Sequence, residues 1–572
     1  MSFTVFRMPG HWRPLLARVA ALTTSAEPEP QEYPFAPSDV ARLQRLTAGD
    51  ADAALDDPTW RDLLLERYAE LVSAETSIFG RQVLYRRLRN GSSEDEAALR
   101  RNRIETLLAD PGRLARLHHG LRALRHADIE VAGLLFDSDA SSTLAPLQPA
   151  WLRVWFLIPL LLAASIAAAL LLSPLAWLAT AVAMYLLVAP QMRYRERMEE
   201  WSRLGGALQM LLRVCSLLDG SGHPLAEDFT GRAKQAGWIS RHLKPSPLVD
   251  GAPLVKDYQH WFMLANVRHY FKSVRLAFAQ RAFLCECYDL CANLEADVAL
   301  ARHLLATPLW CWAGRSAARS LALEEGVHPL VEGASALSIA LDGKGAFLSG
   351  QNGVGKSTFL RTLGLNLVVA RAFGWCYARS ARLPAVPVIA SMQNEDSLLG
   401  GQSLYIAELA RARDLLAAAG SGRPVVCLVD EIFRGTNHEE SVSAAAAVLD
   451  ELARDAMVVV SSHNLVLGPL LAHRLAPWRV TRGADGMLGL EPGVLGRTNG
   501  IALLADHGFG AAVQDKAAQV AAWLASQRHA ETGADLLAGR SGSEHKETSL
   551  RGQSTSTSTE EPYVAHGSSN EY

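Results

Sequence analysis

Cysteine is scarce in this chain, with seven residues in 572. Cys285, Cys287 and Cys291 fall on one expected helix, but no second pair of ligands accompanies them, so their spacing does not indicate a zinc site. Net charge is nearly absent as well, −3 with neutral histidines, which excludes a general attraction to nucleic acid. Residues 1–30 have charges and no uninterrupted apolar core, so no cleavable signal peptide is expected. Such a composition is typical of an ordinary intracellular globular protein, and a length of 572 residues leaves room for three or four domains.

A phosphate-binding loop is the most specific feature that is present. Residues 350–358 read Gly-Gln-Asn-Gly-Val-Gly-Lys-Ser-Thr, after a short apolar run and before a helical pattern that extends to about Phe373. Strand, glycine loop and helix in this order are the context that such a loop requires. Its backbone N–H groups and the helix N-terminus favour phosphate. The sequence therefore predicts an ATP site with these nucleotide-binding residues: Gly350, Asn352, Gly353, Gly355, Lys356, Ser357 and Thr358.

Two further apolar runs end in residues that a nucleotide hydrolase needs. Residues 424–429 are typical of a strand that is buried on both faces of a parallel sheet, and Asp430 and Glu431 follow them. Asp430 is expected to hold Mg²⁺ together with Ser357, and Glu431 to polarise the attacking water. Residues 457–462 form another such run, followed by His463, which could sense the γ-phosphate or orient water. We therefore predict hydrolysis of ATP to ADP and phosphate, with Glu431 and His463 as the catalytic residues.

These motifs resemble those of the MutS family of DNA mismatch-repair ATPases. The family's phosphate loop, its Asp-Glu-x-x-Arg-Gly-Thr segment and its histidine after two small residues correspond to residues 350–358, 430–436 and 461–463. Gln351 replaces the proline of the family's loop. Residues 401–408 resemble a segment whose serine, here Ser403, reaches the nucleotide of a partner subunit in the family. The resemblance implies a homodimeric nucleotide switch that binds ATP and Mg²⁺ and acts on DNA, in mismatch repair or damage sensing.

The resemblance extends to a helical lever, and it covers roughly residues 60–135 and 280–520. Residues 1–60 are too short for the family's mismatch-recognition domain and lack its Phe-x-Glu wedge, and the DNA clamp also has no counterpart. Residues 81–125 hold eleven arginines against five acidic residues. This basic stretch suits DNA phosphates or acidic lipid head groups, and equally a solvated helix face.

Two uncharged apolar runs interrupt the expected lever. Residues 154–173 and 174–189 each approach the roughly 20 residues that cross a bilayer, and arginines flank the pair on both sides. Positive flanks predict that both ends lie in the cytoplasm. We therefore predict a transmembrane hairpin with residues 154–190 in the lipid bilayer, and a multi-pass protein of the inner (cytoplasmic) membrane whose ATPase domain is cytoplasmic. The alternative is a buried hairpin in a protein core.

The predicted fold is an α/β P-loop NTPase domain of the ABC/MutS type, joined to an α-helical lever that a two-helix transmembrane hairpin interrupts. The expected regions are an irregular leader (1–50), the first part of the lever (51–137), the hairpin (151–193), the returning lever (194–314), the ATPase domain (315–525) and a disordered tail (526–572).

Three classes of function stay open. They are a membrane-tethered MutS-like ATPase, a component of an ATP-driven membrane transporter, and a regulatory scaffold that binds ATP without hydrolysing it. A single hairpin provides few helices for a transport pathway. The presence of Lys356, Asp430 and Glu431 argues against a protein that has lost the ability to hydrolyse ATP. The first class is therefore preferred.

Overall fold

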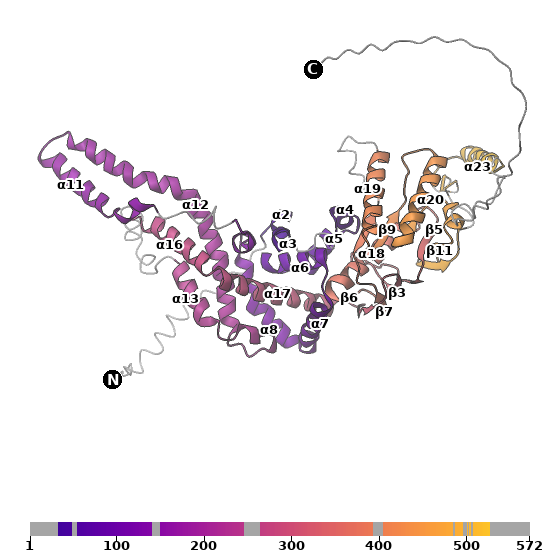
Figure 1. Ribbon diagram of the computed structural model, residues 1–572, viewed down its shortest axis with the longest axis horizontal. Coiled ribbons are helices and arrows are strands. Elements are labelled where there is room, and N and C mark those ends of the chain that lie inside the picture. The colour runs from indigo at the N-terminus through magenta and orange to yellow at the C-terminus, as the bar shows by residue number, and fades with distance from the viewer. Residues whose placement is uncertain are drawn as a thin grey trace, which may run out of the picture.

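The structure is a computed structural model that describes residues 33–47, 54–139, 149–244, 264–392, 404–483, 487–495, 500–501, 503–504 and 507–526. A two-helix arm lies at one end of the molecule, a helical body in the middle and an α/β domain at the other end (Figure 1). Most of the predicted leader, the predicted tail beyond Ser526, and Ser403 lie outside the described residues.

The α/β domain is built on a six-stranded sheet in the order β12-β11-β5-β10-β9-β8. Every neighbouring pair is parallel except β11 and the edge strand β12. The strands are β5 (Gly345–Gly350), β8 (Val388–Ser391), β9 (Val426–Asp430), β10 (Met457–Ser461), β11 (Leu475–Arg482) and β12 (Leu488–Pro492). The helices of this domain are α18 (Lys356–Phe373), α19 (Leu404–Ala419), α20 (His438–Asp455), α21 (Leu467–Leu470) and α23 (Ala511–Ser526).

The central strands of this sheet are apolar throughout because helices cover both of its faces. Every residue of β5, β9 and β10 is buried. Alternate residues of β9 pack into different clusters: Val426 and Leu428 join the cluster that contains α18, and Cys427 and Val429 join the one that contains α20. The continuous apolar runs in the sequence are therefore strands of a parallel sheet that are buried on both faces.

Smaller sheets connect this domain to the body. A four-stranded sheet has the order β2-β7-β3-β4, and β1 pairs with β6. These strands are β1 (Cys311–Trp312), β2 (Gly314–Arg315), β3 (Ser320–Gly326), β4 (Leu337–Asp342), β6 (Trp375–Cys376) and β7 (Ser380–Leu383).

The body is helical, and its helix α17 (Arg281–Ala306) packs against α6, α7 and α8. The buried Glu295 carboxylate of α17 caps the N-terminus of α6, where it accepts hydrogen bonds from the N–H groups of Ser77 (2.9 Å) and Gly80 (3.0 Å). The other elements are α2 (Pro37–Val40), α3 (Arg42–Thr47), α4 (Asp57–Asp62), α5 (Leu65–Val72), α6 (Ile78–Asn90), α7 (Glu94–Ala109), α8 (Pro111–Leu121), α9 (Ala132–Phe136), α13 (Ala233–Leu243) and α16 (Ala265–Ala279), with short 3-10 helices η3 (Arg122–His126), η4 (Ala150–Arg153) and η5 (Pro224–Phe229). The two segments that resemble the family's lever thus lie side by side.

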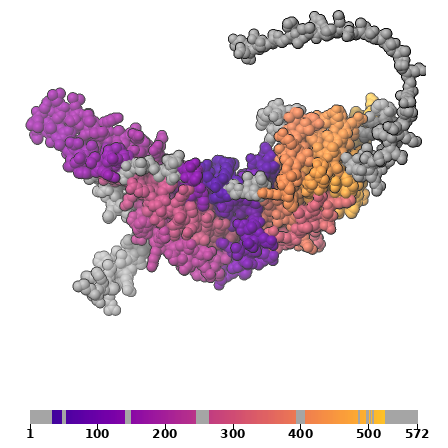
Figure 2. All heavy atoms as spheres, in the orientation of Figure 1, coloured from indigo at the N-terminus to yellow at the C-terminus, as the bar shows by residue number. Residues whose placement is uncertain are grey.

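The arm corrects the prediction of a transmembrane hairpin. It consists of α11 (Leu157–Leu171) and the first part of α12 (Ala176–Leu218), and it protrudes from the body (Figure 2). Within the described residues, no helix combines the length and the apolar character that a membrane span requires. The 15 residues of α11 rise only about 22 Å against a hydrocarbon core of about 30 Å, and the apolar part of α12 ends near Pro190. The predicted hairpin in the bilayer is therefore wrong, and so is the inner-membrane location that depended on it.

Polar and apolar contacts join the two arm helices. The Thr180 hydroxyl donates to the Ser165 hydroxyl (3.0 Å), and Leu162 of α11 and Ala183 and Leu187 of α12 are buried. The alternative of a hairpin buried in a core does not hold either, because many of the arm's large apolar side chains are exposed, Leu171 to 82%.

Candidate nucleotide-binding site

Three adjacent parallel strands place the predicted site residues at one edge of the sheet. Strand β10 lies between β5 and β9, and Ser461 is in register with Leu348 on one side and with Asp430 on the other. The phosphate loop follows β5, Glu431 follows β9, and His463 follows β10. Because the carboxyl ends of parallel strands meet at one edge, these residues converge despite their separation in sequence. Such an edge is where α/β sheets bind their ligands.

The phosphate loop depends on glycine at two positions with left-handed backbone. Gly353 has a φ of 71° and Gly355 a φ of 107°. A Cβ atom on Gly355 would also lie 2.7 Å from Leu488 Cδ1. Such a backbone is strained for any residue with a side chain, and the close approach of Leu488 adds a clash at Gly355. The loop can therefore turn its N–H groups inward only with glycine at these positions.

Lys356 begins α18 and is folded back over the loop. Its Nζ donates to the carbonyls of Gly350 (3.0 Å) and Gln351 (3.1 Å). Burial lowers the pKa of Lys356, although the negative charges of Glu431 and Asp430 oppose this change. Two neutral carbonyls are weaker acceptors for an ammonium group than ionised oxygens are. The lysine is thus held where phosphate oxygens would replace its present partners.

Hard oxygen ligands for a magnesium ion are present beside the loop. The Ser357 hydroxyl, in the first turn of α18, makes no hydrogen bond within the part of the chain that the structure describes. The nearly buried Asp430 accepts a hydrogen bond from the Ser461 hydroxyl on Oδ1. In the described residues, no group of three or more His, Cys, Asp and Glu side chains could hold a metal. Ser357 and Asp430 thus offer two oxygen ligands. Such a small set fits Mg²⁺, because Mg²⁺ keeps water and phosphate oxygens among its ligands.

Glu431 lies in a strained turn at the end of β9. Its φ is 57° and that of Phe433 is 58°, both in the left-handed region. Each such residue costs about 1–3 kcal/mol unless its surroundings impose the conformation. Here the N–H of Glu431 donates to the carbonyl of Ser461 (3.0 Å), and the Ser441 hydroxyl donates to the carbonyl of Phe433. The neighbouring strand and α20 therefore hold this turn in place.

The Glu431 carboxylate is held between the imidazole of His463 and the guanidinium of Arg434. It pairs with His463 Nε2, and its Oε2 lies 3.2 Å from Arg434 Nη1. Burial by itself would raise the pKa of Glu431, but the hydrogen bond from His463 and the charges of His463, Arg434 and Lys356 outweigh it, so the pKa is lowered. The group is therefore a carboxylate at neutral pH, as a residue that polarises water must be.

The structure adds residues to which the sequence assigned no role. Glu408 of α19 accepts hydrogen bonds from the N–H groups of Arg434 (3.0 Å) and Gly435 (3.3 Å), so it supports the turn that follows Glu431. Arg434 pairs with Glu431, and Ser461 orients Asp430. Glu408, Arg434 and Ser461 all belong to the segments that resemble MutS. That resemblance was the one sequence signal that could have indicated their roles. Ser403 lies outside the described residues, immediately before α19.

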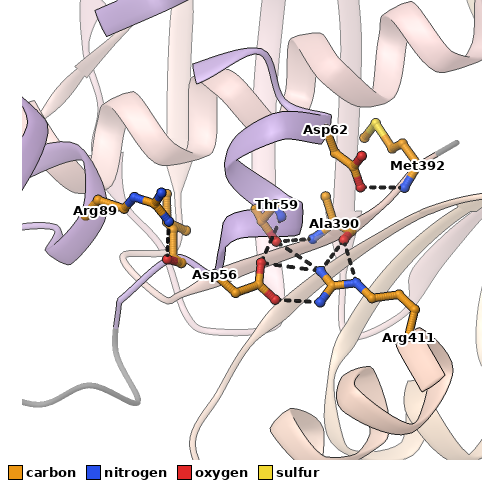
Figure 3. Close-up of polar contacts among 8 residues, drawn as sticks. Asp56, Thr59, Asp62, Arg89, Ala390, Met392 and Arg411 are labelled. Atoms are coloured by element: carbon orange, nitrogen blue, oxygen red, sulfur yellow. Dashed lines mark hydrogen bonds and ion pairs between the residues drawn. The ribbon is translucent and has the colours of Figure 1, made fainter. Parts of the chain in front are cut away.

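Helix α19 also connects the site to the helical body (Figure 3). The Arg411 guanidinium contacts Asp56 (Nη1 to Oδ2, 2.5 Å) and Thr59 (Nη2 to Oγ1, 3.2 Å), and its Nε donates to the carbonyl of Ala390 (3.1 Å). Asp62, at the other end of α4, accepts a hydrogen bond from the N–H of Met392 (2.7 Å). The short helix α4 is thus bonded both to α19 and to the edge strand β8.

Comparison with known proteins places the site in a family. Residues 346–476, from β5 to the start of β11, match MutS domain V. The matched stretch contains the phosphate loop, Asp430, Glu431 and His463. The site lies in a MutS-type domain.

Individual relatives agree with this assignment. The DNA mismatch repair protein MutS of a Synechococcus strain is 35% identical over 196 residues, which are 32% of this chain and 21% of that protein. The endonuclease MutS2 of Thermus thermophilus is 35% identical over 193 residues, 33% of this chain and 24% of that protein. The DNA mismatch repair protein msh3 of Aspergillus fumigatus is 35% identical over 141 residues, 23% of this chain and 12% of that protein.

These matches support membership of the MutS family. In each of the three cases the match spans less than a quarter of the length of the relative. The likeness to MutS therefore concerns the nucleotide-binding domain and does not extend over the whole of these proteins.

Proposed function

We propose that the protein binds ATP with Mg²⁺ and hydrolyses it to ADP and phosphate. The observation that supports this most is the convergence of Lys356, Asp430 and Glu431 at the ends of adjacent strands of a MutS-type domain. Bound Mg²⁺ would neutralise the charge on the phosphates. The phosphate loop would bind those phosphates, and Ser357 and Asp430 would hold the metal.

The residues around Glu431 then have separate tasks. Glu431 would orient the attacking water and accept its proton. His463 and Arg434 keep the carboxylate ionised and in one position, because each of them pairs with it. Glu408 and Ser441 fix the turn from which the carboxylate projects. These last two are positioning residues, since they touch the backbone of the turn.

The proposal extends to a dimeric nucleotide switch that acts on DNA, in repair or damage sensing. It is supported by the mismatch-repair names of the relatives and by Ser403, whose counterpart completes the partner's site in the family. The basic stretch 81–125 supports DNA binding only in part, because Arg87, Arg89 and Arg100 are buried in the body. Two exposed arginines of α8 remain available for phosphates: Arg113 and Arg116.

The test of the chemistry uses two variants that should fail in different ways. Glu431→Gln should abolish turnover and leave ATP bound, because it removes the base but none of the phosphate contacts. Lys356→Ala should weaken ATP binding itself, since the lysine would contact the phosphates in the ground state as well. Glu439→Gln is the matched control, because this glutamate is exposed in the first turn of α20.

ATP affinity and single-turnover hydrolysis are measured for all three variants. An equal loss of affinity in Glu431→Gln and Lys356→Ala would exclude Glu431 from the catalytic role. Unchanged turnover in Glu431→Gln would refute the proposed mechanism.

A further inference from the structure

A polar cavity lies at the opposite end of α18 from the phosphate loop. It has a volume of about 440 Å³ and is lined by the C-terminal end of α6 and the N-terminal end of α7, among them Arg86, Ser92 and Arg100. The Ser92 hydroxyl donates to the carbonyl of Ala372, near the end of α18 (2.8 Å). Because the 18 residues of α18 rise about 27 Å, this cavity is separate from the nucleotide site.

The lining carries more positive charge than its acidic residues balance. Arg86, Arg87 and Arg100 line the cavity with a single acidic residue, Glu96. Arg87 is already neutralised, because its Nη1 lies 2.8 Å from Asp297 Oδ1. Glu96 accepts a hydrogen bond from the N–H of Ser93 (2.9 Å) as part of the cap of α7. Two guanidinium groups are left facing one carboxylate.

Arg100 is buried without a carboxylate partner. It is only 7% exposed, and its Nη1 donates to two neutral acceptors, the Ser92 hydroxyl (2.8 Å) and the carbonyl of Ala372 (2.5 Å). Its Nε has no hydrogen-bond partner among the described residues. Burial, with a contribution from the charge of Arg87, lowers the pKa of Arg100 to about 9. A buried cation is costly unless an anion accompanies it.

Arg86 is the second unbalanced group. Its side chain is partly buried at the cavity, and it makes no hydrogen bond or ion pair with the part of the chain that the structure describes. Burial lowers the pKa of Arg86, and the more distant charges of Asp289 and Glu96 only partly oppose this. This arginine can therefore bind a ligand without giving up an existing contact.

We propose that this cavity binds a compact phosphate-bearing anion through Arg86 and Arg100. The fork of N–H donors in arginine matches the oxygens of a phosphate group, and the cavity volume lies in the range of small-molecule sites. The ligand is either free phosphate or the phosphate group of a small metabolite. The inference does not depend on hydrolysis at the nucleotide site.

The experiment is done in the Lys356→Ala background, so that phosphate binding at the loop does not contribute. Inorganic phosphate, and separately a sugar monophosphate, are titrated by calorimetry at constant ionic strength. Arg86→Gln should weaken the affinity about tenfold or more, because it removes a charge-assisted hydrogen bond. Arg86→Lys should restore part of the affinity. Arg101→Gln is the matched control: this neighbour of Arg100 is exposed and pairs with Glu105 (2.8 Å).

Binding of inorganic phosphate alone, or tighter binding of the sugar phosphate, would each support the site and identify the source of its phosphate group. Three results would overturn it: no binding in the Lys356→Ala background, the same affinity in Arg86→Gln as in Arg101→Gln, or binding of duplex DNA through Arg86 without binding of either small phosphate. Circular dichroism melts confirm that the Arg86 variants are folded.

Discussion

Arg411 provides the clearest test of how the MutS-type domain is attached to the helical body. Its side chain is 13% exposed, and that of its partner Asp56 is 38% exposed. The perturbation is Arg411→Gln, which removes the charge and most of the donors but keeps a polar side chain. Asp56 then keeps its hydrogen bond from the N–H of Thr59 (2.8 Å), and the carbonyl of Ala390 loses its guanidinium partner.

The expected loss of stability follows from this partial burial. Separating a fully buried ion pair costs about 3–5 kcal/mol, and an exposed pair contributes about 0–1 kcal/mol. Because water can reach Asp56, we expect the loss of the Arg411–Asp56 ion pair to cost about 2 kcal/mol. The loss of the hydrogen bond to the carbonyl of Ala390 adds about 1 kcal/mol. Arg411→Gln should therefore lower the free energy of unfolding by about 3 kcal/mol. In a double-mutant cycle with Asp56→Asn, the coupling energy should be about 1–2 kcal/mol.

The assay is urea unfolding at pH 7, followed by circular dichroism, for both single variants and the double variant. Arg413→Gln is the control, because this residue lies on the exposed side of α19. A pH series gives an independent check. Burial would raise the pKa of Asp56, but Arg411 outweighs it and lowers the pKa, so the stabilisation is present above pH 3.8 and is lost as the pH falls below it. The reasoning would be refuted if the stability losses of Arg411→Gln and Asp56→Asn simply added in the double variant. It would also be refuted if Arg411→Gln and Arg413→Gln lowered the free energy of unfolding equally.

Three further predictions concern subunits, DNA and pH. Mixing Ser403→Ala chains with Lys356→Ala chains should partly restore hydrolysis, since one site in each mixed dimer would lack both defects; no recovery in verified heterodimers would mean that each chain acts alone. Replacing both Arg113 and Arg116 by alanine should lower the magnitude of the slope of log K against log salt concentration for duplex binding by about 2. The change should be equal for matched and mispaired DNA. Burial and the charge of Arg361 lower the pKa of His328 to about 4, so its unfolded form binds more protons and stability is lost as the pH falls from 6.5 to 4. His328→Asn should escape this loss of up to about 3 kcal/mol, and urea unfolding at both pH values measures the difference.

The nucleotide-binding part of the fold was predictable because its signals are local. The phosphate loop has to follow a strand and begin a helix, and the structure places β5 before it and α18 from Lys356 to Phe373 after it. The runs that end before Asp430 and His463 are strands for the same reason, since a two-sided parallel sheet requires continuous apolar sequence. The roles assigned to Glu431, His463 and Ser403 stay predictions.

The arm and the links between domains were not predictable in this way. An apolar run has the same composition whether it forms a membrane span or a protruding arm, and it does not show that α11 begins only at Leu157 or that α12 continues past Pro190. The bonds of Glu295 to Ser77 and of Arg411 to Asp56 join residues that are 218 and 355 positions apart. No local pattern specifies such partners, because they are chosen by the packing of the finished fold.

The proline within α12 gives the arm a mechanical property. Pro190 has no N–H to donate to the carbonyl of Leu186, so the helix is easiest to bend at this point. The next residue, Gln191, is anchored to Asn266 of α16 by two hydrogen bonds (3.1 and 2.7 Å), and Trp201 is anchored to Ser273 (2.8 Å). The segment before the proline rises about 21 Å from Ala176, so a bend of about 10° would displace the arm's tip by about 4 Å. The base of the arm is therefore fixed, and its tip is free to move. A small change of angle at Pro190 would displace the tip by nearly the distance between two neighbouring β-strands.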